Sequence, residues 1–319
     1  MGGDNAPGEI VAGARRAAEE LGVPVVLVGR PDEIGDTGGL EIIEASEVIA
    51  MDAEPGSSVR RLKDSSLVRA AEAVRDGRAS AMVSAGNTGA TMASALLRMG
   101  RIRGIQRPAI ATPIPTPGST PTILLDAGAN AEVQPEWMVQ FARMGAVYAR
   151  DRFAIETPRV GLLSIGEEAG KGNPLVKAAH ELLADGAWAA DIGATWIGNV
   201  EGRDIMTPDV DVVVTDGFTG NVTLKTLEGA MQALIGRLLV AIDTDDTTRA
   251  AGAALAPALD AMVAELHPDT VGGALLLGVN GVCVISHGSS GATAMVNAIG
   301  VAAEMVRADM VGHLAATVA

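Results

Sequence analysis

One pattern recurs along this chain and constrains its fold more than any other: a short apolar run, a glycine-rich turn, and then a stretch with helical spacing. The apolar runs are rich in β-branched residues, as expected for strands that are covered on both faces. We predict strands over residues 25–28, 81–84, 123–125, 160–164, 210–215 and 282–286. We predict helices over residues 10–21, 88–99, 135–148, 175–183 and 289–310. This alternation is typical of an α/β fold with a mainly parallel, doubly wound sheet.

Composition narrows the class of protein. The 319 residues suffice for a large core, and the hydrophobic share of 48% excludes a mainly disordered chain. No low-complexity linker divides the sequence, so we predict a single α/β catalytic domain over residues 1–319. Lys and Arg number 24 against 39 Asp and Glu, a net charge of −15, so nucleic acid is not an expected partner. Aromatic residues make up only 2%, which disfavours stacking platforms for bases.

The cysteine and histidine content argues against several kinds of site. The single cysteine, Cys283, lies in an apolar run and is interpreted as a small buried hydrophobe. The histidines at 180, 267, 287 and 313 show no metal-ligand spacing, so we expect neither a metal nor a cofactor. Residues 1–10 lack the features of a signal peptide, and no apolar run approaches the ~18 residues of a membrane span. A cytoplasmic location is therefore expected.

One segment breaks the alternation. Apolar residues at helical spacing flank an acidic stretch that contains Asp243, Asp245 and Asp246. We predict a helical hairpin over residues 229–267 that projects from the α/β body. Its apolar faces either pack on that body or form an interface with another copy or a partner.

Five predicted strands run into small polar loops that precede helices. These loops cover residues 84–90, 126–130, 166–173, 216–221 and 286–292. Glycine lets backbone N–H groups approach a ligand, and a helix N-terminus adds a positive dipole end, so such loops suit an anion like phosphate. Tight turns between strands and helices also use these residues for structure alone. Together, at the carboxyl ends of strands, they predict an anion site. None matches the P-loop pattern or a clean GxGxxG, which disfavours an NTPase or a simple dinucleotide site.

The same loops carry motifs that resemble those of the bacterial phosphate acyltransferases, which make acyl phosphate from acyl-[acyl carrier protein] and inorganic phosphate. The matching segments are MGGDNAP (1–7), SAGNTGA (84–90), DAGAN (126–130), GEEAGKGN (166–173), IGNVEGRD (197–204), DGFTGNVTLKTLEG (216–229) and LGVNGVCVISHGSS (277–290). The resemblance implies a Rossmann-like α/β/α sandwich of the isocitrate/isopropylmalate dehydrogenase type. It also implies a cytoplasmic homodimer, peripheral at the inner face of the membrane. The implied partners are acyl carrier protein and the membrane glycerol-3-phosphate acyltransferase of phospholipid synthesis.

Two departures from the family pattern carry expectations of their own. Typical members have a short strand ahead of the first loop, whereas here that loop begins at Met1, so we expect a first strand to be missing from this sequence. Typical members have a leucine-rich hairpin tip with basic flanks, whereas here the tip reads AGAALAPAL (251–259) with three aspartates before it, so we expect weak membrane attachment.

The chemistry implied by the resemblance is acyl transfer from a thioester to phosphate. Phosphate is already an anion, and a thiolate, with a reference pKa of about 8.5, leaves with little proton help. Orientation and stabilisation of the oxyanion then dominate. We predict that Lys171 holds phosphate, that Asn221 and nearby backbone amides face the oxyanion, and that His287 protonates the thiolate or contacts phosphate. A solvated lysine, a helix-capping asparagine and a structural histidine are the alternatives.

Further residues complete the predicted site. The phosphate- and substrate-binding candidates are Asn5, Gly86, Asn87, Thr88, Asp126, Asn130, Gly172, Asn173, Asn199, Glu201, Arg203, Asp216, Thr219, Gly220, Ser289 and Ser290. An acidic carrier protein needs a basic patch on this acidic chain, and the arginines that supply one are Arg98, Arg101, Arg103 and Arg107. Two other functions remain open at this point: a phosphate acetyltransferase acting on acetyl-CoA, and a carrier-protein-binding adaptor without turnover.

Overall fold

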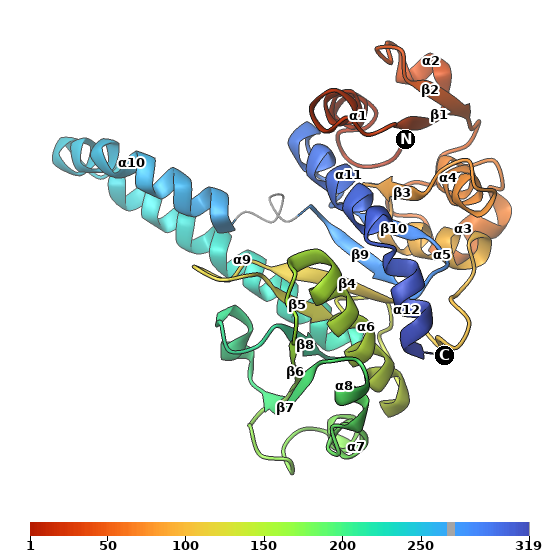
Figure 1. The fold of residues 1–319 in the computed structure, drawn as a ribbon. Coiled ribbons are helices and arrows are strands. Elements are labelled where there is room, and N and C mark those ends of the chain that lie inside the picture. Colours follow the sequence, from red (N-terminus) through yellow and green to blue (C-terminus); the bar gives the residue numbers. More distant parts are fainter. Residues whose placement is uncertain (267–271, 319) are drawn as a thin grey trace.

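The computed structural model describes residues 1–266 and 272–318, and its strands form two sheets (Figure 1). The strands are β1 (Val26–Gly29), β2 (Glu41–Glu44), β3 (Ala81–Ser84), β4 (Ala109–Ile114), β5 (Thr122–Leu125), β6 (Arg159–Leu163), β7 (Thr195–Val200), β8 (Val212–Val214), β9 (Ala274–Leu277) and β10 (Val282–Ile285). All six predicted strands are confirmed. The sequence pattern missed β2, β4, β7 and β9.

Thirteen helical segments connect the strands of the described chain. They are α1 (Gly8–Leu21), α2 (Pro31–Ile34), α3 (Pro55–Arg61), α4 (Ser66–Arg75), α5 (Thr88–Arg98), α6 (Pro135–Phe153), α7 (Pro174–Leu183), α8 (Ala187–Asp191), the 3₁₀ helix η1 (Gly202–Met206), α9 (Gly217–Ile242), α10 (Asp246–Leu266), α11 (Ala292–Arg307) and α12 (Met310–Val318).

The larger sheet has eight strands in the order β3-β10-β9-β4-β5-β8-β6-β7. The prediction of a mainly parallel sheet holds for its two outer parts and is wrong at its centre. There β9 runs antiparallel to both β10 and β4, and β4 runs antiparallel to β5. The reason lies in the connections: a proline-rich turn over 115–121 joins β4 to β5, and a short turn at Gly278 joins β9 to β10. Short connections of this kind join antiparallel neighbours.

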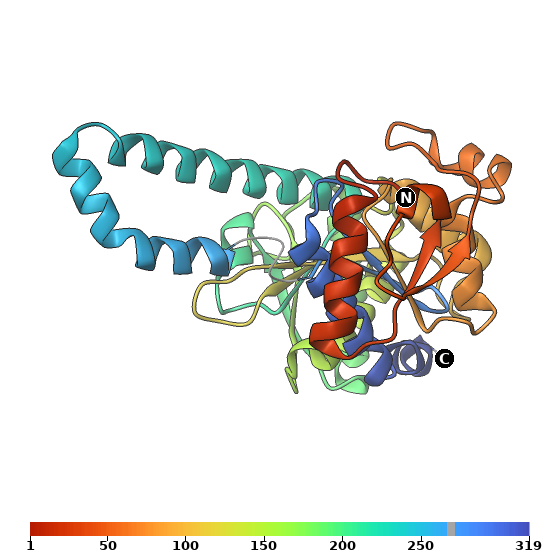
Figure 2. The same ribbon diagram turned by 90° about the horizontal axis from the view of Figure 1, so that it is seen from above.

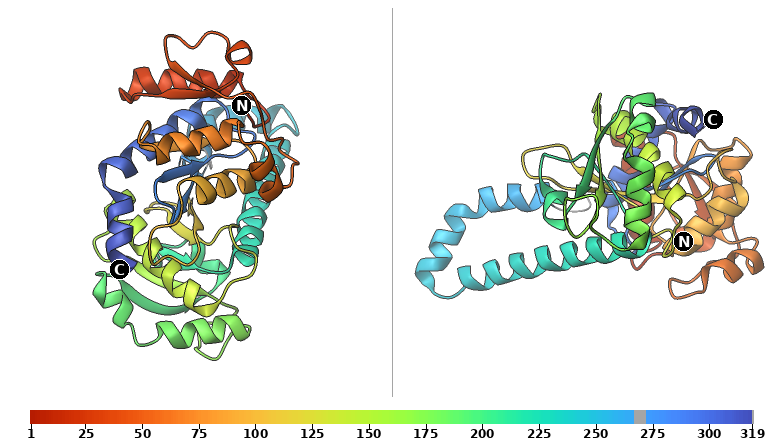
Figure 3. Two further views of the ribbon diagram at one scale, coloured as in Figure 1. Left: turned by 90° about the vertical axis from the view of Figure 1, so that its right-hand side faces the viewer. Right: turned by 90° about the horizontal axis from the view of Figure 1, so that it is seen from below.

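Both faces of the large sheet are buried, because successive strand residues point to opposite sides. In β9, Leu275 and Leu277 pack with α6, α11 and α12, whereas Leu276 packs with α4 and α5 on the other face. Figure 3 shows helices on both sides of the strands. Helix α6 contributes large side chains to this core, with Phe141 and Tyr148 fully covered. Full burial of the Phe141 side chain contributes about 1.5–3 kcal/mol.

A groove separates the small sheet from the large one. The small sheet pairs β1 with β2 in parallel, and the large sheet ends at β3. Between β1 and β3 lies a cavity of about 590 Å³, lined mainly by apolar residues of these strands and of α1, α4 and α11. Met1 lies against Gly29 at this cavity, and its carbonyl accepts a hydrogen bond of 3.3 Å from Ser66 Oγ.

Helices α9 and α10 run side by side away from the rest of the molecule (Figures 1 and 2). Helix α9 begins at Gly217, earlier than the predicted start at residue 229, because its first turns follow β8 directly. Residue 267, where the predicted hairpin ends, lies outside the described residues. Several large apolar side chains on both helices are exposed, among them Leu234 (72%), Leu239 and Leu255. None of the described helices is long and apolar enough to span a membrane.

Candidate active site

The loop after β5 is organised by one buried carboxylate, Asp126. Its Oδ1 accepts hydrogen bonds from the N–H groups of Ile110, Gly128 and Ala129 at 2.8–3.1 Å. Its Oδ2 accepts from both the backbone N–H and the side-chain Nδ2 of Asn130 at 2.8 Å. Burial raises the pKa of the Asp126 carboxyl, and these hydrogen bonds oppose that shift. Every acceptor position is used within the protein, so Asp126 shapes this loop.

The start of α9 packs directly on that loop. Asp216 caps the helix, since its Oδ1 accepts from Thr219 N and its Oδ2 from Thr219 Oγ1. A Cβ at Gly220 would lie 1.9 Å from the carbonyl oxygen of Asp126, so only glycine allows this close approach. Gly217 N donates to Asn130 O, so the nearest backbone donors are already paired.

Asn221 follows on α9 and differs from its neighbours. Its side chain is exposed, borders Gly128, and makes no hydrogen bond with any described residue. Both donors of its amide are free for a ligand. The prediction that backbone amides near Asn221 face the oxyanion loses support, because those of Gly217, Thr219 and Gly220 are occupied. We call residues 126–130 and 216–221 the Asp126 set.

The loop after β6 carries Lys171. The side chain of Lys171 is exposed, lies over Gly166, and forms no ion pair within the part of the chain that the structure describes. Its backbone N–H donates to Glu168 O at 2.9 Å, and the following Gly172 has a φ of +101°, which favours glycine. Asn173 then caps α7, its Oδ1 accepting from Val176 N at 2.9 Å. The result is a tight loop that presents a free ammonium group.

The segment after β7 braces this loop. Asn199 is buried and donates from Nδ2 to Glu168 O at 2.9 Å. Glu201 begins η1 in a reciprocal capping box with Asp204. Arg203 forms ion pairs with Glu167, which lies in the loop 166–173 that carries Lys171, at 3.1 Å and with Glu201 at 3.2 Å. We call residues 164–173 and 199–204 the Lys171 set.

The third group of predicted residues lies at the ends of β3 and β10. Asn5 Nδ2 donates to Ser289 O at 2.9 Å, and Asp4 N donates to Gly288 O at 2.8 Å. Asn87 caps α5 through Ala90 N and donates to three carbonyls of the 50–53 segment, so its side chain is fully used. Between Ser84 and Asn87 lies the buried Gly86, and the exposed Thr88 begins α5.

His287 in the same group has a defined tautomer. Its Nδ1 accepts from Ser289 N at 3.3 Å and lies 2.7 Å from Ser289 Oγ. The proton of the neutral ring is therefore on Nε2, which remains available to donate. Ser290 is buried, and its Oγ pairs with Ser286 Oγ at 2.8 Å. We call residues 1–7, 84–88 and 286–290 the His287 set.

The sheet topology decides how the three sets relate. Strands β5, β8, β6 and β7 are adjacent and parallel, so the Asp126 and Lys171 sets follow neighbouring strand ends. Strands β3 and β10 run in the opposite direction, so the loops of the His287 set follow strands antiparallel to those of the other two sets. One buried apolar cluster nevertheless reaches both sides, since it contains Ala90 and Ile285 together with Ala127 and the partly buried Leu224.

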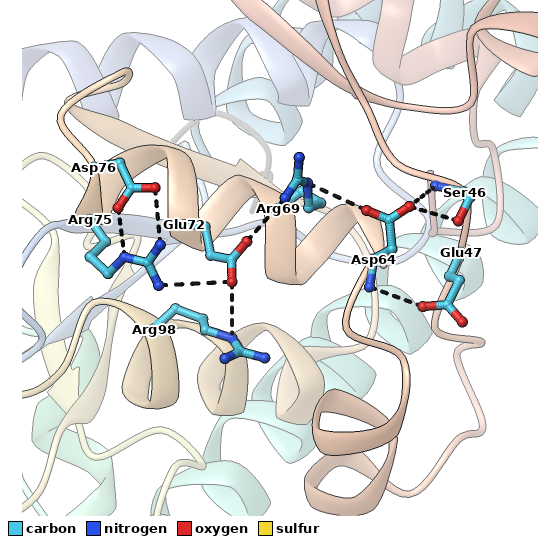
Figure 4. Close-up of polar contacts among 8 residues, drawn as sticks. All are labelled: Ser46, Glu47, Asp64, Arg69, Glu72, Arg75, Asp76 and Arg98. Atoms are coloured by element: carbon cyan, nitrogen blue, oxygen red, sulfur yellow. Dashed lines mark hydrogen bonds and ion pairs between the residues drawn. The ribbon is translucent and has the colours of Figure 1, made fainter.

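The predicted arginine cluster divides. Arg98 lies against Glu72 at 3.7 Å, within a network of charged residues that joins α4 and α5 (Figure 4). Arg101, Arg103 and Arg107 form no ion pair with any described carboxylate, although Arg101 donates to Gln106 O. Arg101 and Arg107 border a hollow of about 780 Å³, where Arg107 lies 4.8 Å above the centre of the Trp137 ring.

Sequence reasoning missed several residues beside these sets. His180 on α7 contacts Asn199, and only its spacing from the lysine loop could have indicated it. Ile165 and Phe218, which are 81% and 66% exposed, flank the predicted catalytic residues in the chain. The sequence signal that could have identified these two residues is their position in or next to the loop motifs. Among the described residues, no group of three or more His, Cys, Asp or Glu side chains is arranged to hold a metal ion.

Comparison with known proteins supports the motif analysis. Residues 1–312 match the family described as fatty acid synthesis protein. The phosphate acyltransferase of Heliobacterium modesticaldum is 48% identical over 98% of this chain and 94% of its own length. That of Elusimicrobium minutum is 45% identical over 98% of this chain and 92% of its own length.

Solved structures with the same fold are more distant in sequence. The EutD phosphotransacetylase from Staphylococcus aureus has a TM-score of 0.61 at 14% identity, covering 94% of this chain and 91% of that one. A branched-chain phosphotransacylase from Enterococcus faecalis has a TM-score of 0.61 at 14% identity, covering 96% of each chain. These structures show a mixed α/β fold around a central sheet. Because the matches to its sequence relatives extend over nearly the whole chain, this protein belongs to the phosphate acyltransferase family.

Proposed function

We propose that this protein transfers an acyl group from acyl-[acyl carrier protein] to inorganic phosphate, and so supplies acyl phosphate for glycerol-3-phosphate acylation. The observation that carries the mechanism is the contrast in hydrogen bonding at the two neighbouring loop sets. Asp126, Asp216 and Asn173 are occupied by backbone donors, whereas the ammonium of Lys171 and the amide of Asn221 are exposed and without described partners. A free cation and a free donor are what phosphate and an oxyanion require.

The proposed reaction needs no covalent enzyme intermediate. An oxygen of hydrogen phosphate attacks the thioester carbonyl carbon, and a C–O bond forms while the carbonyl oxygen becomes an oxyanion. The C–S bond then breaks, and the proton of the phosphate passes to the departing thiolate. Lys171 binds and orients phosphate, which converts its attack into a step within one complex. Asn221 Nδ2 donates to the oxyanion, where a single donor is worth about 10²–10³ in kcat in other enzymes.

His287 is proposed as a second donor. Because its Nδ1 accepts from Ser289 N, Nε2 is the ring nitrogen left to donate, and we assign its proton to a phosphate oxygen or the thiolate. The remaining candidates of the His287 set, Asn5 and Ser289, are joined by a hydrogen bond and hold that loop to the amino-terminal segment.

The carrier protein is proposed to dock at the hollow that Arg101 and Arg107 border, with Arg103 between them in the chain. None of the three forms an ion pair with a described carboxylate, and the chain has a net charge of −15, so these arginines offer a local attraction to an acidic partner. Pro108 borders the same hollow, and its carbonyl accepts from Asn130 Nδ2 at 2.8 Å, which links the hollow to the Asp126 set. Arg98 is left out of the docking surface because Glu72 already pairs with it.

A second copy of the chain is proposed to cover the exposed apolar side chains of α9 and α10, giving a homodimer. Leu234, Leu239 and Val240, near the carboxyl end of α9, are each more than half exposed, and exposed apolar side chains gathered on one element are typical of an interaction surface. Peripheral contact with the membrane is proposed to be weak, because Asp243, Asp245 and Asp246 at the turn repel anionic lipid.

The test is direct. Purified protein is incubated with phosphate and, in parallel, with acyl-[acyl carrier protein], acyl-CoA or acetyl-CoA, and acyl phosphate is followed. Rapid formation from the carrier-bound donor supports the proposal. A preference for acetyl-CoA would assign a phosphate acetyltransferase, and carrier binding without product would assign an adaptor.

A further inference from the structure

We propose that His180 is a positioning residue for Lys171, acting through the side chain of Asn199. The inference rests on the proposed role of Lys171 in binding phosphate. It assigns a function to a histidine of α7 that lies outside all three loop sets.

The carbonyl of Glu168 lies at the turn before Lys171. This oxygen accepts two hydrogen bonds of 2.9 Å, one from the backbone N–H of Lys171 and one from Asn199 Nδ2. Asn199 is therefore one shared atom away from the backbone of Lys171. Because Asn199 is only 5% exposed and emerges from β7, it anchors a surface loop to the sheet.

Two hydrogen bonds fix the orientation of the Asn199 amide. The Glu168 carbonyl can only accept, so the nitrogen of the amide must face it. The oxygen, Oδ1, then faces His180 Nδ1 at 2.9 Å. Since that oxygen can only accept, His180 must carry a proton on Nδ1. His287 shows the opposite tautomer, because its Nδ1 accepts from Ser289 N.

The imidazole of His180 is held by aromatic packing. Its ring meets the Trp196 ring edge to face, with centroids 5.8 Å apart, and Trp196 in turn contacts Trp188 at 6.2 Å. The ring is thus held by aromatic packing on one side and by Asn199 on another. The half-buried Nδ1–H of His180 therefore holds the Asn199 amide in one orientation. In that orientation Asn199 Nδ2 keeps its hydrogen bond to Glu168 O, and the backbone of Lys171 stays in place.

The consequence concerns phosphate binding more than folding. The loop 166–173 contains three glycines, and the other contacts described for it are the exposed Arg203–Glu167 ion pair and the Asn173 cap at its end. Without the Nδ1–H donor of His180, the Asn199 amide is free to rotate. The hydrogen bond from Asn199 Nδ2 to Glu168 O is then broken for part of the time. Lys171 then meets phosphate from a wider set of positions, which lowers affinity for phosphate.

Two variants of one residue test this relay. His180→Leu removes the donor, whereas His180→Asn retains an amide N–H at the same number of bonds from the backbone as Nδ1. His313→Leu is the matched control, because His313 of α12 pairs with Asp151 of α6, outside the three loop sets. We expect His180→Leu to raise the KM for phosphate about tenfold with a smaller change in kcat. The His180→Asn and His313→Leu proteins should stay within about twofold of the parent.

Hydrogen exchange supplies a readout that does not depend on activity. Amides of residues 166–173 should exchange several-fold faster in His180→Leu and at the parent rate in His180→Asn. Asn199→Asp, which loses the donor to Glu168, should give the same acceleration. The double variant should exchange no faster than either single one, because both changes cut the same relay.

The outcomes separate this inference from the proposed function. Unchanged exchange in His180→Leu, or a KM equally raised in His180→Asn, overturns the relay. Faster exchange with an unchanged phosphate KM also overturns the positioning role. If Lys171→Ala itself leaves the phosphate dependence unchanged, the proposed function of Lys171 fails, and the exchange data alone then report on the relay.

Discussion

The loops after β5 and β6 occupy equivalent places in the sheet and carry opposite kinds of polar group. Both follow strands that run parallel to β8, which lies between them. In the first loop, the charged residue Asp126 is wholly buried and accepts hydrogen bonds from five donors. In the second, the charged residue Lys171 is exposed, and only its backbone is bound to the protein.

This difference shows which polar residues build the site and which are left to act. A buried carboxylate without its donors, or donors without their carboxylate, costs far more than an exposed ammonium without a partner. Residue type and motif do not make that distinction, since both residues lie in glycine-rich loops after strands. We therefore expect substitutions in the first loop to affect stability and substitutions in the second to affect phosphate binding.

The largest effect is expected for Asp126→Ala. It leaves five donors without an acceptor, and the free energy of unfolding should fall by about 3–5 kcal/mol. Urea denaturation followed by circular dichroism measures this. Asp216→Ala is the graded control, because it removes the cap of α9 alone and should cost about 1 kcal/mol. Equal losses in the two variants would contradict the role given to Asp126.

The next effect concerns the groove between β1 and β3. Extending the chain ahead of Met1 by a short apolar strand should fill this cavity and raise stability by roughly 1–3 kcal/mol, the burial gain less the cost of ordering the added residues. Activity per folded molecule should stay the same, because neither loop is altered. Thermal melts of both proteins provide the measurement, and identical midpoints would refute the expectation.

The pH dependence of that gain has a defined sign. Burial lowers the pKa of the Met1 amino group below its ordinary value. The folded chain therefore binds this proton less tightly than the unfolded chain, so its stability rises with pH up to about 8. The extended chain lacks this buried ammonium. The advantage of the extension should accordingly shrink between neutral pH and pH of about 8.

Lys171→Ala tests the second loop. Loss of a cation that holds phosphate should lower kcat/KM for phosphate about tenfold or more, which corresponds to about 1.4 kcal/mol. The free energy of unfolding should change by less than about 0.5 kcal/mol, since the side chain is exposed and has no described partner. Lys171→Arg keeps the charge and should retain more activity. A stability loss comparable to that of Asp126→Ala would erase the contrast between the loops.

The smallest effect is expected at the arginines beside the hollow. Reversing the charge at Arg101 and Arg103 should raise the KM for acyl-[acyl carrier protein] several-fold, and added salt should reduce the difference. The KM for acyl-CoA should hardly change. Arg98→Glu serves as a contrast, because Arg98 pairs with Glu72 and its reversal should lower stability first. Equal effects on both donors would place the docking surface elsewhere.

Much of the fold follows from local pattern. The six strands predicted from apolar β-branched runs are present, and so are the helices that follow the glycine-rich loops. The four missed strands lack that pattern, each for a local reason. β4 contains Pro113 and runs into a proline-rich turn, and β7 contains Gly198 and two polar residues, so neither has a clear strand pattern. β2 has glutamates at both ends, and β9 lies just after two glycines.

The candidate site divides along the same line. The sequence by itself determined the family, through motifs that extend over most of the chain, and it placed Lys171 and His287 in loops after strands, whereas Asn221, expected in such a loop, lies in the first turns of α9. Such information is local, because a loop motif and the strand before it are contiguous. Only the tertiary structure decided that β3 and β10 oppose β5, β6 and β8, that Asp126 and Asn87 are fully bonded within the protein, and that Arg98 is paired. It also brought His180 to Asn199 and Glu168. Those outcomes depend on strand pairing and on burial between distant segments, and no window of sequence specifies either.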